Sequence, residues 1–173
     1  MEETKERTIV LTKKQIHYDI DALTYQLTES AMQGSDPKAR NAVASDQGDA
    51  YNKSVMTRLT DYRDATLRRK LLFCLAEEEE SESFSNSLDT DCDYLYKLVV
   101  PASFKGLKSL GLKMHEYMVK GALLDWYIQS GISVSTAALA EQVNDLESEI
   151  VSMLRVTNSV KKPLQPFGPA RVI

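Results

Sequence analysis

The sequence predicts a mainly α-helical protein, a bundle of about four helices with one small β-hairpin and an extended C-terminal tail. Three observations support this fold class. Apolar residues recur every three or four positions along several long stretches, which is the period of an amphipathic helix. Only residues 94–100 alternate in the manner of a strand. The last fifteen residues hold three of the five prolines, so they favour neither helix nor central strand. We expect a helical domain at residues 1–154, with the hairpin near 83–100, and an extended arm at 155–173.

The composition is typical of one soluble globular domain. The chain has 173 residues, of which 43% are hydrophobic and 27% charged, and its net charge is -4. This net charge favours neither nucleic acid nor an anionic membrane as a general partner. Two cysteines are too few for a disulfide framework. The first residues lack the basic and apolar regions of a signal peptide, and no stretch has the length of a membrane span. We therefore expect a cytoplasmic protein without membrane contact.

The first helix is predicted at residues 13–32. Thr12 followed by Gln15 has the spacing of a capping box, and Gly34 is suited to end the helix. Its apolar face, at steps of four and three, consists of Ile16, Ile20, Leu23, Leu27 and Ala31.

A second helix is predicted from near residue 45 or 46 toward Glu79. Because a single helix of this length would span about 50 Å, we expect a kink or a change of packing partner near Thr66. The basic residues Arg68, Arg69 and Lys70 follow this point and are most simply a solvent-exposed face. The apolar positions form two stripes, first Tyr51, Val55, Leu59, Tyr62 and Thr66, then Leu67, Leu71, Cys74 and Leu75.

An acidic, serine-rich segment precedes the predicted strand. Residues 77–93 carry eight acidic and no basic side chains, and the strand at residues 94–100 ends at Pro101. We expect this strand to pair with residues 83–88. Because an isolated hairpin is only marginally stable, its residues Tyr94, Tyr96 and Leu98 should pack on helices of the same chain or form an inter-subunit strand with a neighbour.

Two further helices are predicted as antiparallel partners. The first begins after Ser103, ends at Gly131 and is apolar on two faces, so we expect it to lie buried between partners. Gly121 beside Ala122 allows another helix to approach closely. The second helix is amphipathic, with charged residues between its apolar positions. The expected buried residues include Leu107, Leu110, Met114, Tyr117, Leu124 and Ile128 on one face of the first helix, Leu112, His115, Val119, Leu123 and Trp126 on its other face, and Leu139, Val143, Leu146, Ile150 and Met153 on the second helix.

No pattern of catalytic or metal-binding residues is present. His17 and His115 lie on separate predicted helices, and Val119 stands where a zinc protease helix has its second histidine. Three alternating aspartates before the strand begin like a calcium-binding loop, but tyrosine and valine replace the required glycine and glutamate. We therefore predict no enzymatic activity, no catalytic or metal-binding residue and no cofactor.

The order of these elements resembles that of the head-to-tail adaptor proteins, or connector and neck proteins, of tailed bacteriophages. The likeness runs through a polar helix with "YQLTESAM", a long second helix, an acidic loop, the strand and proline turn "YLYKLVVPASF", a helix with "HEYMVKGALLDWYI", an amphipathic helix and a basic, proline-containing tail. It covers most of the chain in element order, involves no invariant motif, and is strongest from Tyr94 to Ile128.

This resemblance implies a virion structural protein of the neck, assembled in the host cytoplasm. It would form a homo-oligomeric ring, commonly of twelve copies, below the portal protein and in contact with other neck or tail proteins. DNA would pass through the ring without sequence-specific binding. Because the family uses an extended C-terminal arm to grip the portal or a neighbouring subunit, the arm would dock through Lys161, Lys162, Pro163, Leu164, Phe167, Arg171 and Ile173. Prolines suit a docking arm because they reduce the entropy lost on ordering.

The charge pattern gives a second hypothesis about assembly. Residues 155–173 carry four basic and no acidic side chains, so the arm of one subunit can meet the acidic loop of the next in a heterologous contact. Exposed ion pairs contribute little each, so the contact would set register more than affinity. The acidic loop can alternatively face the DNA channel, where a negative wall lets DNA slide. Its acidic residues include Glu77, Glu78, Glu79, Glu80 and Glu82.

The alternative from another functional class is a helical regulatory or nucleic-acid-binding protein that uses the basic residues 68–70. The acidic net charge weighs against it, as does the lack of a short glycine turn between helices of the recognition type. A metal-dependent or hydrolytic enzyme on a four-helix bundle would need Glu-x-x-His ligand pairs, which the sequence lacks.

Overall fold

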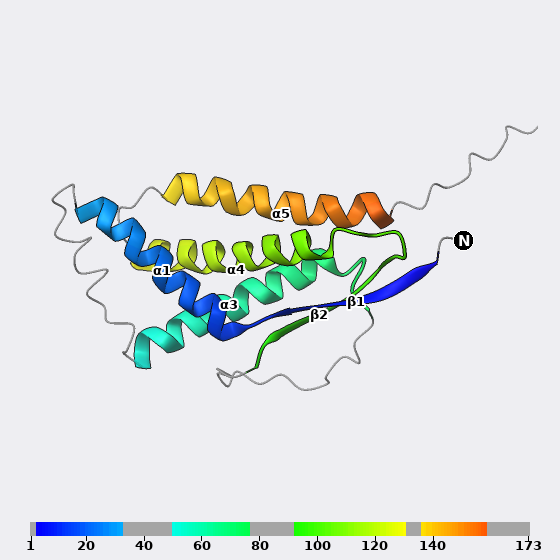
Figure 1. Cartoon of the computed structure of the whole chain (residues 1–173). Helices are drawn as coiled ribbons and strands as arrows, with labels where there is room; N and C mark the ends of the chain where they lie inside the picture. Colours follow the sequence, from blue (N-terminus) through cyan, green and yellow to red (C-terminus); the bar gives the residue numbers. More distant parts are fainter. Residues whose placement is uncertain (1–2, 33–49, 77–91, 131–135, 159–173) are drawn as a thin grey trace, which may run out of the picture.

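Within residues 3–32, 50–76, 92–130 and 136–158, which are those that the structure describes, the computed structural model forms four helices and one two-stranded antiparallel sheet (Figure 1). This confirms the predicted mainly α-helical bundle with one small β element. The elements are, in order, β1 (Thr4–Leu11), α1 (Lys13–Met32), α3 (Ala50–Leu71), β2 (Tyr94–Pro101), α4 (Leu107–Ser130) and α5 (Thr136–Asn158).

Helix α4 is the centre of the bundle. Helices α1, α3 and α5 all pack on it, and β1 lies against its first turns. Ten residues of α4 are buried, as expected for a helix between partners. Leu112 and Ile128 differ from the prediction, since both are largely exposed.

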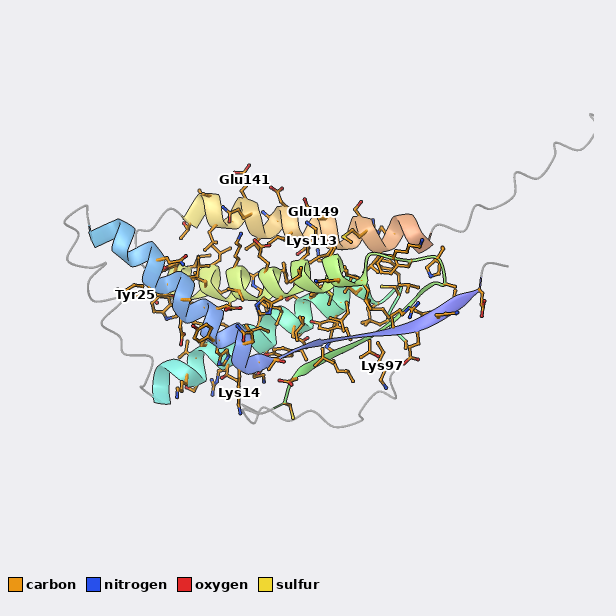
Figure 2. The ribbon with its side chains drawn as sticks, in the orientation of Figure 1. Lys14, Tyr25, Lys97, Lys113, Glu141 and Glu149 are labelled. Atoms are coloured by element: carbon orange, nitrogen blue, oxygen red, sulfur yellow. The ribbon has the colours of Figure 1, made fainter. Side chains whose placement is uncertain are left out.

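Helix α5 runs antiparallel to α4, as predicted (Figure 1). Its apolar positions Val143, Leu146 and Ile150 are buried, and ion pairs link it to its neighbours at Lys113–Glu149 and Lys70–Glu147. The first of these pairs is visible in Figure 2. Helix α5 continues past residue 154, where we expected the domain to end, as far as Asn158.

The sheet joins the two strands in a register that pairs Thr4 with Pro101 and Leu11 with Tyr94. Alternate residues of β2 point into the core. The partner of β2 is therefore β1, whereas residues 83–88, the expected partner, lie outside the described residues. The sequence signal for β1 is weak because only Ile9 and Leu11 are buried and its first half is charged and exposed.

Helix α3 ends at Leu71, short of the expected Glu79, because the following chain runs along the other edge of β2. Leu75 forms an antiparallel bridge to Leu98, and the residues on either side of Leu75 form backbone hydrogen bonds with β2 at 2.7 and 2.8 Å. Such extended backbone cannot continue a helix. Strand β2 therefore has backbone partners on both edges.

The buried face of α3 is more polar than the predicted apolar stripe. Tyr62, expected on that stripe, is 64% exposed, whereas Thr57 and Thr60 are buried. The hydroxyl groups of these threonines donate to helix carbonyls of Lys53 and Met56 at 2.8 and 3.1 Å. Because the hydroxyl groups are satisfied within the helix, they can be buried at little cost.

Helix α1 begins at the predicted residue, but its cap differs from the predicted capping box. The backbone N–H of Lys13 donates to the carboxylate of Asp93 at 3.0 Å. Gln15, expected to reach back to Thr12, donates through its side chain to Asp19 at 3.0 Å. A carboxylate at a helix N-terminus satisfies a free donor and complements the helix dipole. The residue before β2 thus fixes the start of α1.

Gly121 makes room for the side chain of Arg63. A Cβ atom at Gly121 would lie 2.9 Å from Cδ and Nε of Arg63. The guanidinium then forms a bidentate pair with Asp125, with Nε–Oδ2 at 2.7 Å and Nη2–Oδ1 at 2.6 Å. The close approach predicted at Gly121 is therefore that of an arginine, and the resulting ion pair joins α3 to α4.

We predict opposite effects for alanine at two glycines of α4. Gly121→Ala should lower the free energy of unfolding, because it displaces Arg63 and leaves Asp125 unpaired. Because the side chains of this bidentate pair are only 14% and 19% exposed, we expect its loss to cost more than the roughly 1 kcal/mol that alanine gains over glycine in a helix. Gly111→Ala is the matched control, because its Cβ would meet only Ile9 Cγ2 at 3.7 Å. Urea unfolding should show Gly111→Ala as neutral or stabilised, and equal losses in both variants would contradict this account.

Candidate functional site

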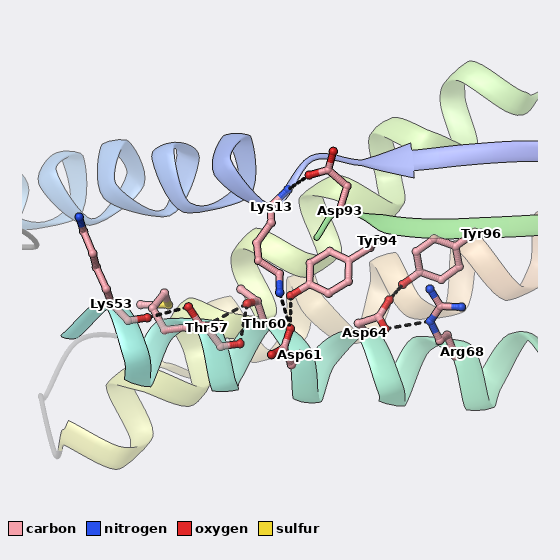
Figure 3. A network of polar contacts seen from close by, with 11 residues as sticks. Lys13, Lys53, Thr57, Thr60, Asp61, Asp64, Arg68, Asp93, Tyr94 and Tyr96 are labelled. Carbon is pink, nitrogen blue, oxygen red and sulfur yellow. Dashed lines mark hydrogen bonds and ion pairs between the residues drawn. The ribbon is translucent and has the colours of Figure 1, made fainter. Parts of the chain in front are cut away.

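The strand residues Tyr94, Tyr96 and Leu98 lie in the interior of their own chain. All three are buried, and the tyrosines face α3 (Figure 3). Of the two alternatives for this strand, packing on helices of the same chain accounts for these side chains. They contribute to the core and offer little surface to a neighbouring subunit.

One polar unit joins α1, α3 and β2. The hydroxyl of Tyr94 donates to Asp61 at 2.6 Å, and Lys13 Nζ pairs with the same carboxylate at 3.0 Å (Figure 3). The ammonium group also lies 4.9 Å from the centre of the Tyr94 ring. Lys13 is only 4% exposed, so these contacts replace the water that a charged amine would otherwise bind.

A second unit of the same composition lies one turn further along α3. The hydroxyl of Tyr96 donates to Asp64 at 2.5 Å, and Arg68 Nε donates to the same carboxylate at 2.8 Å. Arg68 also covers the Tyr96 ring at 4.6 Å and donates to the backbone carbonyl of Leu95 at 2.7 Å. Helix α3 is therefore attached to β2 at two successive points by the same combination of phenol, carboxylate and cation.

The protonation of these tyrosines is fixed by their surroundings. Burial, together with the adjacent carboxylates of Asp61 and Asp64, raises the pKa of Tyr94 and Tyr96 far above the usual value for tyrosine. Both hydroxyl groups therefore remain hydrogen-bond donors at any physiological pH. The two units hold the fold together and are not suited to proton transfer.

We predict that Tyr96→Phe lowers the free energy of unfolding by about 1–3 kcal/mol, because the Asp64 carboxylate loses a donor in a mostly buried position. The matched control is Tyr62→Phe on helix α3, which should be neutral because Tyr62 is largely exposed. Thermal or urea unfolding measures both. If Tyr96→Phe and the wild type have similar stability, the hydroxyl makes no net contribution to the free energy of unfolding.

His17 lies close to the first polar unit and has a buried Nε2 atom that finds no hydrogen-bond partner in the described part of the chain. Burial lowers the pKa of His17, and the charges of Lys13 and Lys53 lower it further, while Asp61 acts in the opposite direction. The folded chain therefore favours the neutral imidazole.

This pKa shift predicts a loss of stability on acidification. Because the folded state binds a proton at His17 less readily than the unfolded state, stability should fall as pH drops from about 7 to 5.5, by at most about 1.4 kcal/mol per pH unit. This window lies above the range in which ordinary carboxyl groups titrate. His17→Gln, which is neutral throughout, should unfold with a flatter pH dependence in urea titrations. A slope unchanged by the substitution would assign the effect to other groups.

A groove of about 310 Å³ lies between α1 and α4. Its floor is apolar and consists of Ala22, Leu23 and Val119. Two pairs of polar side chains border it, a hydrogen bond between His115 and Asp19 at 2.7 Å and an ion pair between Lys120 and Glu116 at 2.6 Å. The groove was not predicted from the sequence, because it needs two helices that lie about a hundred residues apart. Its full lining is Asp19, Ala22, Leu23, Gln26, His115, Glu116, Val119 and Lys120.

A second, more polar groove of about 430 Å³ lies where α3 ends against α5. Arg155 lies 5.7 Å from the centre of the Phe73 ring at this end of the bundle, where Leu72 is also exposed. This groove is lined by Lys70, Glu147, Ser148, Val151, Ser152 and Arg155. Lys70 and Glu147 pair with each other, and Arg155 covers the Phe73 ring. The lining of this groove is thus mainly polar, and the α1–α4 groove is the better site for an apolar ligand.

The basic residues 68–70 largely serve contacts within the chain. Arg68 belongs to the second polar unit, and Lys70 pairs with Glu147 at 2.9 Å. Arg69 is exposed. The regulatory or nucleic-acid-binding alternative therefore loses two of the three cations on which it was based.

The remaining predicted site residues lie outside the described part of the chain. They are the acidic loop, including Glu77, Glu78, Glu79, Glu80 and Glu82, and the arm residues Lys161, Lys162, Pro163, Leu164, Phe167, Arg171 and Ile173.

Neither cysteine belongs to a recognisable reactive site. Cys74 is buried, and burial raises its pKa to about 11. Cys92 is exposed. Among the described residues, no three histidine, cysteine or carboxylate side chains gather closely enough to hold a metal ion. The helices in the described ranges include none with the length and apolar character needed to span a membrane.

Comparisons with protein families, with curated proteins and with solved structures find no match to this chain.

Proposed function

We propose that this chain is a head-to-tail adaptor of a tailed bacteriophage, a virion structural protein without enzymatic activity. The observation that carries the proposal is the arrangement of the region with the strongest resemblance. Strand β2, the turn after Pro101 and helix α4 follow one another as the resemblance implies, and α4 is the helix on which the others pack. The proposed protein forms a ring, commonly of twelve copies in such proteins, below the portal.

Exposed apolar side chains support a role in assembly. Val10 and Leu95 are cross-strand neighbours on the outer face of the sheet, and both remain accessible. Leu72 and Phe73 are exposed at the end of α3. Apolar groups that gather on a small protein are typical of surfaces that a partner covers. Assembly with neighbouring subunits and with the portal would bury them.

The distribution of charge also supports contact between unlike surfaces of successive copies. Of the 25 acidic residues, seven lie in residues 77–91, which contain no basic residue. The rest of the chain has the remaining 18 acidic residues and all 21 basic ones. Each copy thus combines one strongly negative segment with a weakly positive remainder. A heterologous contact that repeats around a ring would bring the two together.

The proposal predicts that the chain is located at the head–tail junction. A tagged copy should be supplied during phage production in the native host, and gold-labelled particles should be examined by electron microscopy. Label at the neck is the expected result, and removal of the gene should leave DNA-filled heads without tails. Label elsewhere on the particle, or none on it, would reject the adaptor function.

The docking arm gives this experiment a second readout. Lys161→Glu together with Lys162→Glu should lower incorporation several-fold, and rising salt should weaken assembly of the wild type, because both act on exposed ion pairs. The control is Lys14→Glu, an exposed lysine at the start of α1. Assembly that responds neither to salt nor to the arm substitutions would exclude an electrostatic role for the arm.

A further inference from the structure

The α1 wall of the α1–α4 groove continues into an exposed aromatic stripe. Tyr18 lies four residues before Ala22 and Tyr25 three residues after it, so the three share one side of the helix. The two tyrosines are 65% and 58% exposed. Asp21 lies between them on the same side. An apolar floor, two exposed aromatic rings and a carboxylate therefore lie next to one another; Tyr25 is labelled in Figure 2.

The α4 wall continues in the same way. Leu112 precedes Glu116 by four residues, so it extends the wall of the groove by one turn, and it is largely exposed. Its exposure was unexpected from the sequence, which placed it on a buried face. A ligand that follows the groove would find apolar contacts on both helices.

The spacing of the tyrosines matches a particular kind of ligand. Seven residues of helix separate Tyr18 from Tyr25, which is about 10.5 Å along the axis. A polyproline II segment advances about 3.1 Å per residue, so prolines three residues apart are about 9.3 Å apart on one edge. Proline-rich segments with this P-x-x-P spacing bind grooves lined by aromatic rings.

The chain itself contains such a segment. Residues 163–169 read P-L-Q-P-F-G-P, with prolines at every third position. Leu164 and Phe167 are also three residues apart, so in a polyproline II conformation they share a neighbouring edge. Two lysines precede the first proline, which suits the carboxylate between the tyrosines.

We propose that the α1–α4 groove, together with Tyr18 and Tyr25, binds residues 163–169 of a second copy of this chain. The prolines would pack on the tyrosines, while Leu164 and Phe167 would enter the apolar floor. The inference rests on the proposed function in one respect, because a ring brings successive copies into contact. It adds the receptor surface for the arm.

The position of α5 favours a second copy over the chain's own tail. Glu149 pairs with Lys113, which lies two residues before the groove residue His115. From Glu149 the helix runs nine more residues to Asn158, about 13.5 Å away from the groove. The five residues up to Pro163 span at most about 17 Å. To occupy its own groove, the chain would have to turn back after Asn158 and use most of these roughly 17 Å to cover the roughly 13.5 Å to the groove. Its prolines would then still have to reach both tyrosines.

The binding test uses the full chain as acceptor and a fluorescent peptide of residues 159–173 as probe. Pro163→Ala, Pro166→Ala and Pro169→Ala in the acceptor prevent its own tail from competing. Fluorescence anisotropy should show binding that weakens at least tenfold when Tyr18→Ala and Tyr25→Ala are added. Tyr62→Ala is the matched control, an equally exposed tyrosine on α3. A peptide with its three prolines replaced by alanine should also bind at least tenfold more weakly.

These variants should retain the wild-type thermal unfolding, because the replaced tyrosines are exposed. Absence of peptide binding overturns the proposal. Binding that Tyr18→Ala and Tyr25→Ala leave unchanged, or that the prolines do not affect, overturns it as well.

A mixing experiment tests whether the contact joins two copies. Two variants are compared with the wild type: the tail variant carries Pro163→Ala, Pro166→Ala and Pro169→Ala, and the tyrosine variant carries Tyr18→Ala and Tyr25→Ala. Sedimentation of the wild type should show association that rises with concentration, and each variant should associate less. A mixture of the tail variant, whose groove is intact, with the tyrosine variant, whose tail is intact, should form a mixed dimer. A wild type that stays monomeric while the peptide binds would place the tail in its own groove and overturn the contact between copies.

The failure of this proposal can be told apart from the failure of the adaptor function. If label is found at the neck but the peptide does not bind, the adaptor function stands and this contact is rejected. If the peptide binds but no label is found at the neck, this contact stands and the adaptor function is rejected.

Discussion

Lys13 is the residue on whose contacts the arrangement of three elements depends. Its backbone N–H donates to Asp93, and its ammonium group pairs with Asp61 and lies over the ring of Tyr94. A buried cation is costly unless its donors are satisfied. Helix α1, helix α3 and strand β2 must therefore take up their positions together, because each supplies part of the surroundings that this one charge requires.

Apolar packing holds α5 against α4, whereas polar contacts hold α3 against the sheet. This difference decides how far the sequence could predict each arrangement. Helices α4 and α5 are joined by apolar side chains at regular steps, so their extents and faces follow from periodicity. Helix α3 meets the sheet through two carboxylates and an arginine, and its buried face also includes threonines. Such residues look like a solvated face in the sequence, which is why Tyr62 was placed inside and Thr57 and Thr60 were not.

Other features depend on pairing between distant segments and leave almost no local signal. Strand β1 has only two buried residues, and its partner lies more than eighty residues away. The α1–α4 groove forms where two helices distant in the sequence pack together, with Asp19 meeting His115 at its border. Tyr18 and Tyr25 were not part of the apolar face predicted for α1, and only the structure shows that an apolar groove runs beside them. The spacing of the prolines in the arm, by contrast, can be read directly from the sequence. The sequence alone does not indicate the surface to which the arm would bind.

The separation of the two strands also sets the order in which the protein can form. Leu11 pairs with Tyr94, so β1 leaves the ribosome long before its partner is made. Contacts between such distant segments form slowly because the intervening chain must first be ordered. Helices α1 and α3 can form early, yet the cap of α1 and the partner of β1 arrive together with β2. The first strand is thus among the last elements to reach its place, and until then its apolar end remains open to contact with other chains.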